Sequence, residues 1–297
     1  MHGISAMGSR PILVTGAGGM LGTSIVHMLG DKYHRPVIGL SHRSLDVTHA
    51  AAVEAAIRHY RPAAVVHCAA KTAVDACETA VDETFRVNTW ASRLVAQATA
   101  RHGAELVFIS SCGIFPNAVR PFHEDDVPAP RTIYGHSKRQ AELIIATENP
   151  RTYIIRPGWL FGGQSGHSKN FVYQRFLEAQ RVSVIRSVID RFGSPTFVDD
   201  VSRAIHQLLE TRQYGLYHVA NEGMASRFEY VRSIVNGLGL QTPVVPCSAE
   251  DFPRHASVPV SEALTSRNLD RAGLFPLRPW QDALGEYLNQ SRAEWRI

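Results

Sequence analysis

The first 160 residues alternate between short apolar runs and longer segments with helical periodicity, and this rhythm constrains the fold more than any other feature. The apolar runs, which are typical of buried strands, lie at 11–16, 35–40, 63–70, 105–111 and 151–157. The segments that space their apolar residues as helices do are 19–31, 48–60, 83–103 and 137–149. Strands that alternate with helices, and that carry no polar alternation of their own, predict a parallel α/β sheet with both faces covered. Thr48 and Gly103 are expected to cap two of the helices.

The rhythm loosens after residue 158. Helical spacing returns at 171–181 and 199–215, and an apolar run at 215–221 predicts one more strand. Prolines are frequent from residue 243 to residue 279, which is typical of a small lobe of mixed structure. We therefore expect a main unit over residues 10–160 and a second region over 161–297, part of which (199–221) returns to the main sheet.

Composition narrows the class of protein. The formal net charge is +4 without any basic run, which argues against nucleic acid as a partner. The four cysteines form no C-x-x-C pair and the fourteen histidines show no metal-ligand spacing, so we expect neither disulfides nor a metal site. No apolar stretch approaches 18 residues, and the first ten residues lack the apolar core of a signal peptide. We expect a cytoplasmic protein without a membrane segment, beginning with a short, loose extension.

A glycine-rich turn joins the first predicted strand to the first predicted helix. The stretch "TGAGGMLG" (15–22) places Gly16, Gly19 and Gly22 in G-x-x-G-x-x-G spacing. Gly16 suits a tight turn, Gly19 lets a pyrophosphate approach the backbone, and Gly22 lets the helix pack closely on the sheet. The free N–H groups that begin the helix are donors for phosphates. In this context the motif predicts a dinucleotide on a Rossmann-type, doubly wound sheet; a packing turn without a ligand is the alternative.

The end of the second predicted strand bears on which dinucleotide is bound. The chain reads "LSHRSLD" (40–46), with no acidic residue at the tip, where NAD-binding proteins often hold the ribose hydroxyl. Arg43 can hold a 2′-phosphate instead, which favours NADPH and keeps NADH as the second choice. A solvated arginine is the alternative for Arg43. Asp46 comes late for the ribose and is expected to face the adenine.

The stretch "YGHSK" (134–138) sets a tyrosine four residues ahead of one of only four lysines. Chance predicts roughly 0.1 such pairs in a chain of this composition. Residues four apart share one face of a helix, and a neighbouring ammonium lowers the pKa of a tyrosine. The pair therefore predicts Tyr134 as a proton donor with Lys138 as its activator. Ser111, at the carboxyl end of the fourth predicted strand, is placed to hydrogen-bond a substrate carbonyl.

Taken together, these motifs resemble those of the extended short-chain dehydrogenases/reductases, and most closely the dTDP-4-dehydrorhamnose reductases. Further matching stretches, in family order, are "VVHCAAKTAVDACE" (65–78), "HEDDVPAPRTIYGHSK" (123–138), "IIRPGWLFG" (154–162) and "DRFGSPTFVDDVS" (190–202). The resemblance implies NADPH-dependent reduction of a nucleotide-linked 4-keto-6-deoxyhexose, with Ser111, Tyr134 and Lys138 as catalytic residues. We leave a homodimer open as the assembly.

The resemblance also implies which positions contact the two ligands. Those expected to line the cofactor are Gly16, Gly19, Met20, Leu21, Gly22, Arg43, Asp46, Val47, Ala69, Ala70, Thr72, Asn88, Lys138 and Pro157. Those expected to face the nucleotide-sugar substrate are Cys112, Trp159, Asn170, Thr196 and Arg254. The alternatives are a core aromatic for Trp159, a loop cap for Asn170 and the end of a turn for Thr196.

Two departures from the family pattern fall on the substrate side. The family has aspartate and tyrosine where this chain has Cys112 and Gly113, and glutamine where this chain has Arg191. We therefore expect the preferred sugar to differ from 4-dehydrorhamnose at one or more ring positions. The alternative functions are an NDP-sugar epimerase or dehydratase of the same superfamily and a non-catalytic NADP-binding regulatory subunit.

Overall fold

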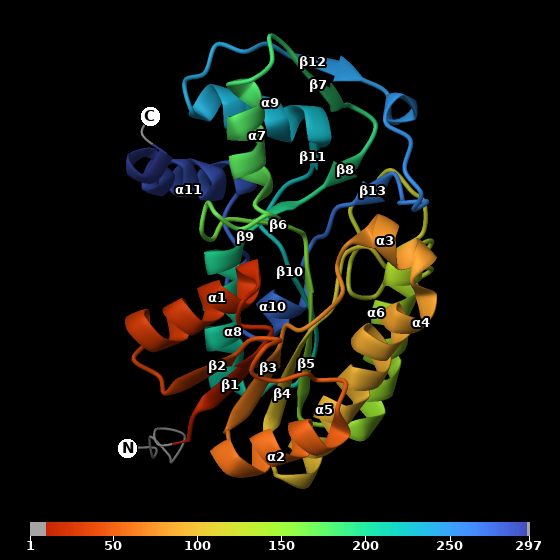
Figure 1. Ribbon diagram of the computed structural model, residues 1–297, viewed down its shortest axis with the longest axis vertical. Helices are drawn as coiled ribbons and strands as arrows, with labels where there is room; N and C mark the ends of the chain where they lie inside the picture. Colours follow the sequence, from red (N-terminus) through yellow and green to blue (C-terminus); the bar gives the residue numbers. More distant parts are fainter. Residues whose placement is uncertain (1–9, 296–297) are drawn as a thin grey trace.

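A parallel sheet of six strands forms the centre of the molecule (Figure 1). The computed structural model describes residues 10–295, so nearly all of the expected N-terminal extension lies outside the described residues. The strand order is β10-β5-β4-β3-β1-β2, and every neighbouring pair is parallel. The strands are β1 (Ile12–Thr15), β2 (Val37–Leu40), β3 (Ala64–His67), β4 (Glu105–Ile109), β5 (Thr152–Pro157) and β10 (Gly215–Val219). The parallel α/β class that the sequence predicts is confirmed.

Helices cover both faces of this sheet, which explains why its strands are apolar throughout. One face carries α1 (Met20–His27), its continuation η1 (Met28–Lys32), and α8 (Val198–Thr211). The other face carries α2 (Ala50–Tyr60), α5 (Ala91–Arg101) and α6 (Ile133–Glu148). Each layer has its own buried cluster, with Ile25 and Ile205 in one and Ile57, Val95 and Ile145 in the other.

Some helix boundaries differ from the predicted ones. The single helix expected over 83–103 is α4 (Val81–Phe85), η2 (Arg86–Trp90) and α5 in succession, and Gly103 follows it at a φ of 66°. Thr48 was wrong as a cap: its hydroxyl donates to Asp46, and α2 begins after His49. Helix α6 begins four residues earlier than expected because the Thr132 side chain accepts from the Gly135 N–H.

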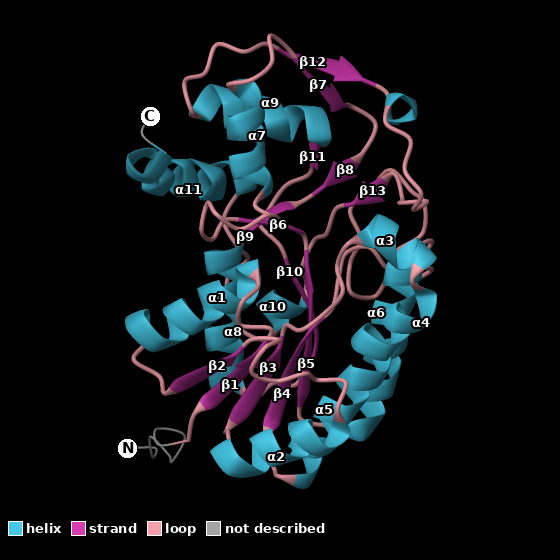
Figure 2. Ribbon diagram, in the orientation of Figure 1, coloured by secondary structure: helices cyan, strands magenta, loops and turns pink. Residues whose placement is uncertain are grey.

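A smaller lobe lies beyond the carboxyl ends of the strands (Figure 2). Its helices are α7 (Phe171–Ala179), α9 (Arg227–Gly237) and α11 (Trp280–Trp295), and the sequence rhythm did not predict the last two. Its short strands pair as β6 (Trp159–Phe161) with β9 (Pro195–Phe197), β7 (Ile185–Val188) with β12 (Val244–Cys247), and β8 (Phe192–Gly193) with both β11 (Ala225–Ser226) and β13 (Ser261–Glu262). The remaining short helices are α3 (Val74–Thr79), η3 (Ala249–Asp251) and α10 (Asn268–Arg271).

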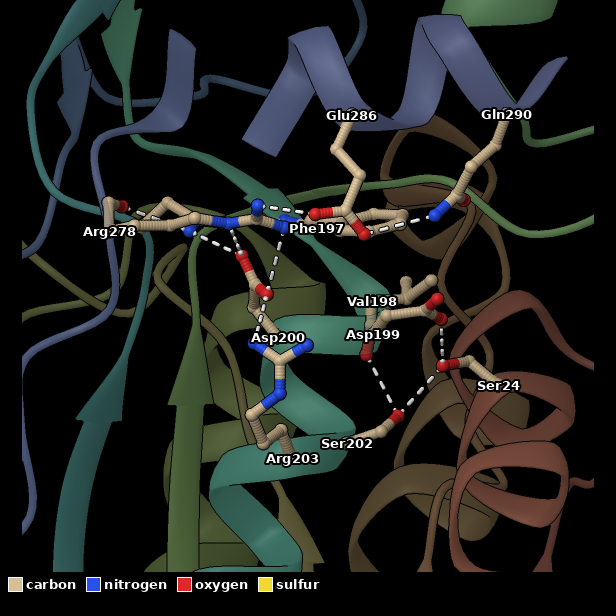
Figure 3. Close-up of polar contacts among 11 residues, drawn as sticks. Ser24, Phe197, Val198, Asp199, Asp200, Ser202, Arg203, Arg278, Glu286 and Gln290 are labelled. Atoms are coloured by element: carbon tan, nitrogen blue, oxygen red, sulfur yellow. Dashed lines mark hydrogen bonds and ion pairs between the residues drawn. The ribbon is translucent and has the colours of Figure 1, made fainter. Parts of the chain in front are cut away.

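A polar cluster at the start of α8 ties this helix to its neighbours (Figure 3). Buried Asp200 receives two hydrogen bonds from Arg278, which also pairs with Glu286 on α11. On the other side of α8, the Ser24 hydroxyl of α1 donates to Asp199. The cluster therefore fixes both α1 and the last helix to α8. Within residues 10–295 no helix is long and apolar enough to cross a membrane.

Candidate active site

A cleft of about 1050 Å³ opens where the parallel strands end, between the main sheet and the smaller lobe. Ligands of open α/β sheets bind at this edge because the loops that leave the strands converge there. The cleft is lined by the turn after β1, the ends of β2, β3 and β4, the first turns of α6, and segments of the lobe. Most predicted site residues border it, namely Gly16, Gly19, Met20, Leu21, Gly22, Arg43, Asp46, Val47, Ala69, Ala70, Thr72, Ser111, Cys112, Tyr134, Lys138, Pro157, Trp159 and Arg254.

The glycine turn forms a cradle at one end of the cleft. Gly16 has a φ of 66°, and a Cβ there would lie 2.7 Å from the backbone nitrogen of Ala69. A Cβ at Gly22 would lie 2.4 Å from the Gly16 carbonyl oxygen, so α1 packs on the turn only without a side chain at that position. Gly19 precedes α1, and no side chain caps the helix. These features leave the helix N-terminus to a phosphate, as dinucleotide binding requires.

Two arginines border the end of the cleft near the tip of β2. Exposed Arg43 lies there, as expected from the sequence, and exposed Arg86 of η2 borders the same end. The carboxylate of Asp46 accepts hydrogen bonds from the backbone and the hydroxyl of Thr48, and these bonds lower the pKa of Asp46. Asp46 therefore fixes the loop that presents Arg43. Arg86 was missed because it lies inside a predicted helix, where an arginine is usually a solvated surface residue.

Ser111, Tyr134 and Lys138 meet in the middle of the cleft. Ser111 is buried two residues after β4, and its Oγ accepts a hydrogen bond of 3.0 Å from the backbone of Gly113. An ideal Cβ at Gly113 would lie 3.5 Å from that Oγ and 4.0 Å from Cε1 of the Tyr134 ring, so the three positions are neighbours. Lys138, one helical turn beyond Tyr134, is buried with its Nζ 4.2 Å from the centre of the Phe108 ring.

Burial dominates the ionisation of this group. It raises the pKa of Tyr134 above its ordinary value, and the neighbouring Ser111 hydroxyl offsets part of that rise. The lowering of the Tyr134 pKa by Lys138 that the sequence predicts is therefore wrong, because burial outweighs any such effect. Burial also lowers the pKa of Lys138 to about 8, against the pull of the Glu142 carboxylate. Tyr134 thus stays protonated at neutral pH, which suits a proton donor.

A buried ion pair between Glu142 and Arg156 lies behind the three catalytic residues. Glu142 follows Lys138 by one turn, and its carboxylate receives hydrogen bonds of 2.8 and 2.7 Å from Arg156 and one of 2.5 Å from Ser110. Burial alone would raise the pKa of Glu142, but the hydrogen bonds and charge of Arg156, together with hydrogen bonds from Ser110 and Arg139, outweigh burial and leave the pKa lowered. Because Ser110 precedes Ser111, this contact ties the end of β4 to the helix that carries Tyr134.

Three predicted site residues do not border the cleft. Asn170 is fully buried, caps α7 through the Tyr173 N–H and donates to the Tyr287 hydroxyl, so the loop-cap alternative is correct. Thr196 is fully buried in the middle of strand β9 and donates to the Ser194 carbonyl, so it lies within a strand and not at the end of a turn. Asn88 is also buried, and its amide holds both backbone groups of Lys71 and the Ser137 hydroxyl. It therefore shapes the wall of the cleft from behind.

Other residues of the lobe border the cleft without having been predicted. The segment His167–Lys169 lies along it, and Lys169 hydrogen-bonds the Thr72 hydroxyl from across the cleft. Arg227 and Glu262 border it beside Trp159. The sequence gives no sign that Trp159, Arg227 and Glu262 meet, because successive members of this group are at least 35 positions apart along the chain. Within residues 10–295 no group of three or more His, Cys, Asp or Glu side chains is arranged to hold a metal.

Comparison with models of protein families shows to which family the chain belongs. The model of the RmlD substrate binding domain matches residues 10–293. The chain belongs to this family. Spore coat polysaccharide biosynthesis protein SpsK of Bacillus subtilis is 35% identical over 280 residues, which cover 94% of this chain and 97% of SpsK. The resemblance to the dTDP-4-dehydrorhamnose reductase group of the extended short-chain dehydrogenases/reductases is thus confirmed.

Two further relatives bear on the ligands. The structure of dTDP-4-dehydrorhamnose reductase from Bacillus anthracis in complex with NADP has a TM-score of 0.90 and 31% identity, and the match covers 95% of this chain and 99% of that one. A probable dTDP-4,6-dihydroxy-2-methyloxan-3-one 4-ketoreductase from Streptomyces antibioticus is 36% identical over 280 residues, covering 92% of this chain and 93% of the relative. Both relatives are named as enzymes that reduce a ketone on a dTDP-linked sugar, and the sugar differs between the two names.

Proposed function

We propose that the protein uses NADPH to reduce the ketone of a nucleotide-linked 4-keto-6-deoxyhexose. One observation carries the proposal: a single cleft joins a glycine cradle at a bare helix N-terminus to the cluster of Ser111, Tyr134 and Lys138. A dinucleotide held by the cradle extends naturally toward this cluster. Relatives that act on dTDP-linked keto sugars, one of them solved with NADP, support the same substrate class and cofactor.

The residues of the chain fit the proposed chemistry. NADPH, when bound, supplies a hydride to the ketone carbon. Tyr134 gives its proton to the ketone oxygen, and its raised pKa keeps that proton in place until the oxygen gains charge. Ser111 orients the oxygen, and the Lys138 ammonium holds the ribose and stabilises negative charge near Tyr134. Pro157, buried at the end of β5, borders the cleft and would contact the nicotinamide of a bound cofactor.

Arg43 is proposed to distinguish the two nicotinamide cofactors. If its guanidinium holds the 2′-phosphate, Arg43→Ala weakens NADPH binding about 10- to 150-fold, which is the range of a charge-assisted contact. NADH binding changes little, because NADH carries hydroxyl there. Fluorescence titration with both cofactors measures the difference, and Arg58→Ala on the exposed surface of α2 is the matched control. Equal losses for NADPH and NADH would remove Arg43 from phosphate recognition.

The lowered pKa of Lys138 predicts a pH dependence. The proposed reaction requires Lys138 as the ammonium. This form is lost as the pH rises through the Lys138 pKa of about 8, which lies well below the ordinary value of 10.5. Tyr134 remains protonated through that range because its own pKa is raised. The kcat/KM for reduction is therefore expected to fall above about pH 8 with a single ionisation. A profile that stays flat to pH 10 would contradict a role for the Lys138 charge.

We also propose which parts of the chain bind the two ligands, how the protein assembles and where in the cell it lies. We assign the dinucleotide to residues 10–160 and the substrate side to 161–297, of which 199–221 lies largely in the main unit.

A homodimer is supported by exposed Val81, Trp90 and Leu143 on neighbouring helices α4, η2 and α6. A cytoplasmic location fits the four free cysteines. Light scattering measures the mass of the assembly and decides between monomer and dimer.

A substrate screen tests the proposed activity. Purified protein is mixed with NADPH and each of several nucleotide-linked 4-keto sugars, and the nicotinamide absorbance is followed. We expect oxidation of NADPH with at least one 4-keto-6-deoxyhexose and none with the corresponding 4-hydroxy sugars. Absence of oxidation across the panel, from protein that binds NADPH, would favour the non-catalytic regulatory subunit instead.

A further inference from the structure

A carboxylate and a guanidinium border the substrate end of the cleft without a part in proton or hydride transfer. Glu262 is the last residue of β13, and Arg227 is the first residue of α9. Both border the cleft that contains Ser111 and Tyr134, and both side chains are half-buried. Charged groups at such a place act on whatever ligand lies beside the catalytic residues.

Strand β8 brings these two residues together. Gly193 pairs with Glu262 of β13 on one side and with Ala225 of β11 on the other, and Arg227 begins α9 directly after β11. The indole of Trp159 packs onto Gly193 so closely that a Cβ there would lie 2.2 Å from its Cε2 atom. Glycine is therefore required at 193 for the indole to lie between the two charged residues.

Trp159 holds both charged side chains in place. Its Nε1–H donates a hydrogen bond of 2.7 Å to Oε2 of Glu262, and the guanidinium carbon of Arg227 lies 3.4 Å from the centre of its ring. The side chain of Trp159 is itself buried, with 9% of the residue exposed. The indole, packed between Gly193 and Arg227, holds the two charged side chains in position. The polar groups available to a ligand at this end of the cleft are therefore the Glu262 carboxylate and the Arg227 guanidinium.

Gly113 leaves room for the Glu262 carboxylate next to the catalytic serine. A Cβ at Gly113 would lie 3.0 Å from Oε1 of Glu262 and 3.5 Å from Oγ of Ser111. Any larger residue at 113, such as the tyrosine of the family pattern, would have to share that space with the carboxylate. The departure at Gly113 and the presence of Glu262 are thus two parts of one arrangement.

The free polar atoms of this arrangement point to a ligand. Among the described residues 10–295, Oε1 of Glu262 has no hydrogen-bond donor, since Trp159 takes only Oε2. The Arg227 guanidinium likewise makes no hydrogen bond or ion pair with residues 10–295, although burial lowers its pKa. A charged acceptor and a set of charged donors, both fixed by Trp159, match a molecule that offers a hydroxyl and an oxygen acceptor close together.

We propose that Glu262 and Arg227 bind the sugar ring and determine which sugar is accepted. The free carboxylate oxygen accepts a hydrogen bond from a ring hydroxyl beside the reacting ketone, and the guanidinium donates to an oxygen of the same sugar. This inference rests on the proposed function and narrows its substrate class to a hydroxylated 4-keto sugar rather than a multiply deoxygenated one. A site with such groups rejects analogues that lack the hydroxyl, because its buried polar atoms are then left unpaired.

Glu262→Gln tests the carboxylate without enlarging or emptying the site. The amide oxygen can still accept from Trp159, while the amide nitrogen offers a donor where the sugar hydroxyl needs an acceptor. For the hydroxylated 4-keto sugar we expect kcat/KM to fall about 10- to 150-fold, the range for loss of a charged hydrogen bond. For the analogue deoxygenated next to the ketone, little change is expected. Equal losses with both sugars would overturn the assignment.

A binding measurement separates this inference from the proposed activity. Calorimetry with dTDP-glucose and with dTDP alone shows how much affinity the sugar adds, and no reaction is needed. Glu262→Gln and Arg227→Met are expected to reduce that added affinity about tenfold and to leave dTDP binding unchanged, while unchanged NADPH affinity shows that the fold is intact. The matched controls are Glu222→Gln and Arg232→Met, two exposed residues outside the cleft.

The outcomes of the two experiments are distinct. If the wild type reduces no 4-keto sugar but the variants still lose the added affinity for dTDP-glucose, the proposed activity is wrong and the sugar contact stands. If the wild type reduces such sugars but the variants bind dTDP-glucose as the wild type does, the activity stands and Glu262 and Arg227 do not read the sugar.

Discussion

Tyr134→Phe is expected to lower kcat by about 10²- to 10⁴-fold, the range for loss of a positioned proton donor. The substitution removes only the hydroxyl, so the ring keeps its place in the first turn of α6. NADPH affinity is expected to stay near that of the wild type, since the cradle and Arg43 lie elsewhere in the cleft. Stopped-flow measurement of NADPH oxidation gives kcat, and fluorescence titration gives the affinity.

The control for this variant is Tyr60→Phe, which removes a hydroxyl at the end of α2, away from the cleft. It is expected to turn over as the wild type does. Turnover of Tyr134→Phe within a few fold of the wild type would mean that another group, or water, protonates the product oxygen.

Glu142→Ala is expected to lower the free energy of unfolding by about 3–5 kcal/mol, because it leaves the Arg156 guanidinium buried without its partner. Both side chains of the pair are 1% exposed, so water cannot replace the lost contact. Since the Glu142 pKa lies below its ordinary value, this contribution is present at neutral pH and is lost as the pH falls through that pKa. Urea unfolding at pH 7 measures the first effect, and a series of unfolding curves from pH 7 down to about pH 2 follows the second.

Glu148→Ala is the matched control on the same helix. Glu148 pairs with Arg93 near the surface, and an ion pair of this kind contributes no more than about 1 kcal/mol. A loss for Glu142→Ala as small as the one for Glu148→Ala would contradict the structural role of the buried pair. It would also weaken the view that Ser110 and Glu142 fix the end of β4 relative to Tyr134.

The cofactor side of the site could be predicted largely from the sequence because local patterns determine it. The glycine spacing, the strand that precedes it and the helix that follows it all lie within residues 11–31. Tyr134 and Lys138 likewise belong to one helix, so their proximity follows from helical geometry. Periodicity did not predict the start of α6, which begins at Ile133 because the Thr132 side chain caps it.

The substrate side could not be predicted in this way. Trp159, Arg227 and Glu262 lie in three segments of the lobe and meet only because β8 pairs with both β11 and β13, each of two residues. Strands this short leave no alternating pattern in the sequence. The resemblance pointed to Cys112, Trp159 and Arg254 here, and these border the cleft. It also pointed to Asn170 and Thr196, and both are buried supports behind the cleft. Polar side chains that form loop caps and those that bind ligands look alike in a sequence.

Net hydride transfer from NADPH to the sugar is measured with NADPH that is doubly deuterated at C4 of its nicotinamide. The labelled cofactor is incubated with the wild-type protein and a dTDP-linked 4-keto-6-deoxyhexose, and the sugar is analysed by mass spectrometry and NMR. We expect one NADP⁺ for each product molecule and one deuterium at C4 of the sugar. Conversion of the sugar without net NADP⁺ would indicate an epimerase or a dehydratase, and a product without deuterium at C4 would contradict the proposed reduction.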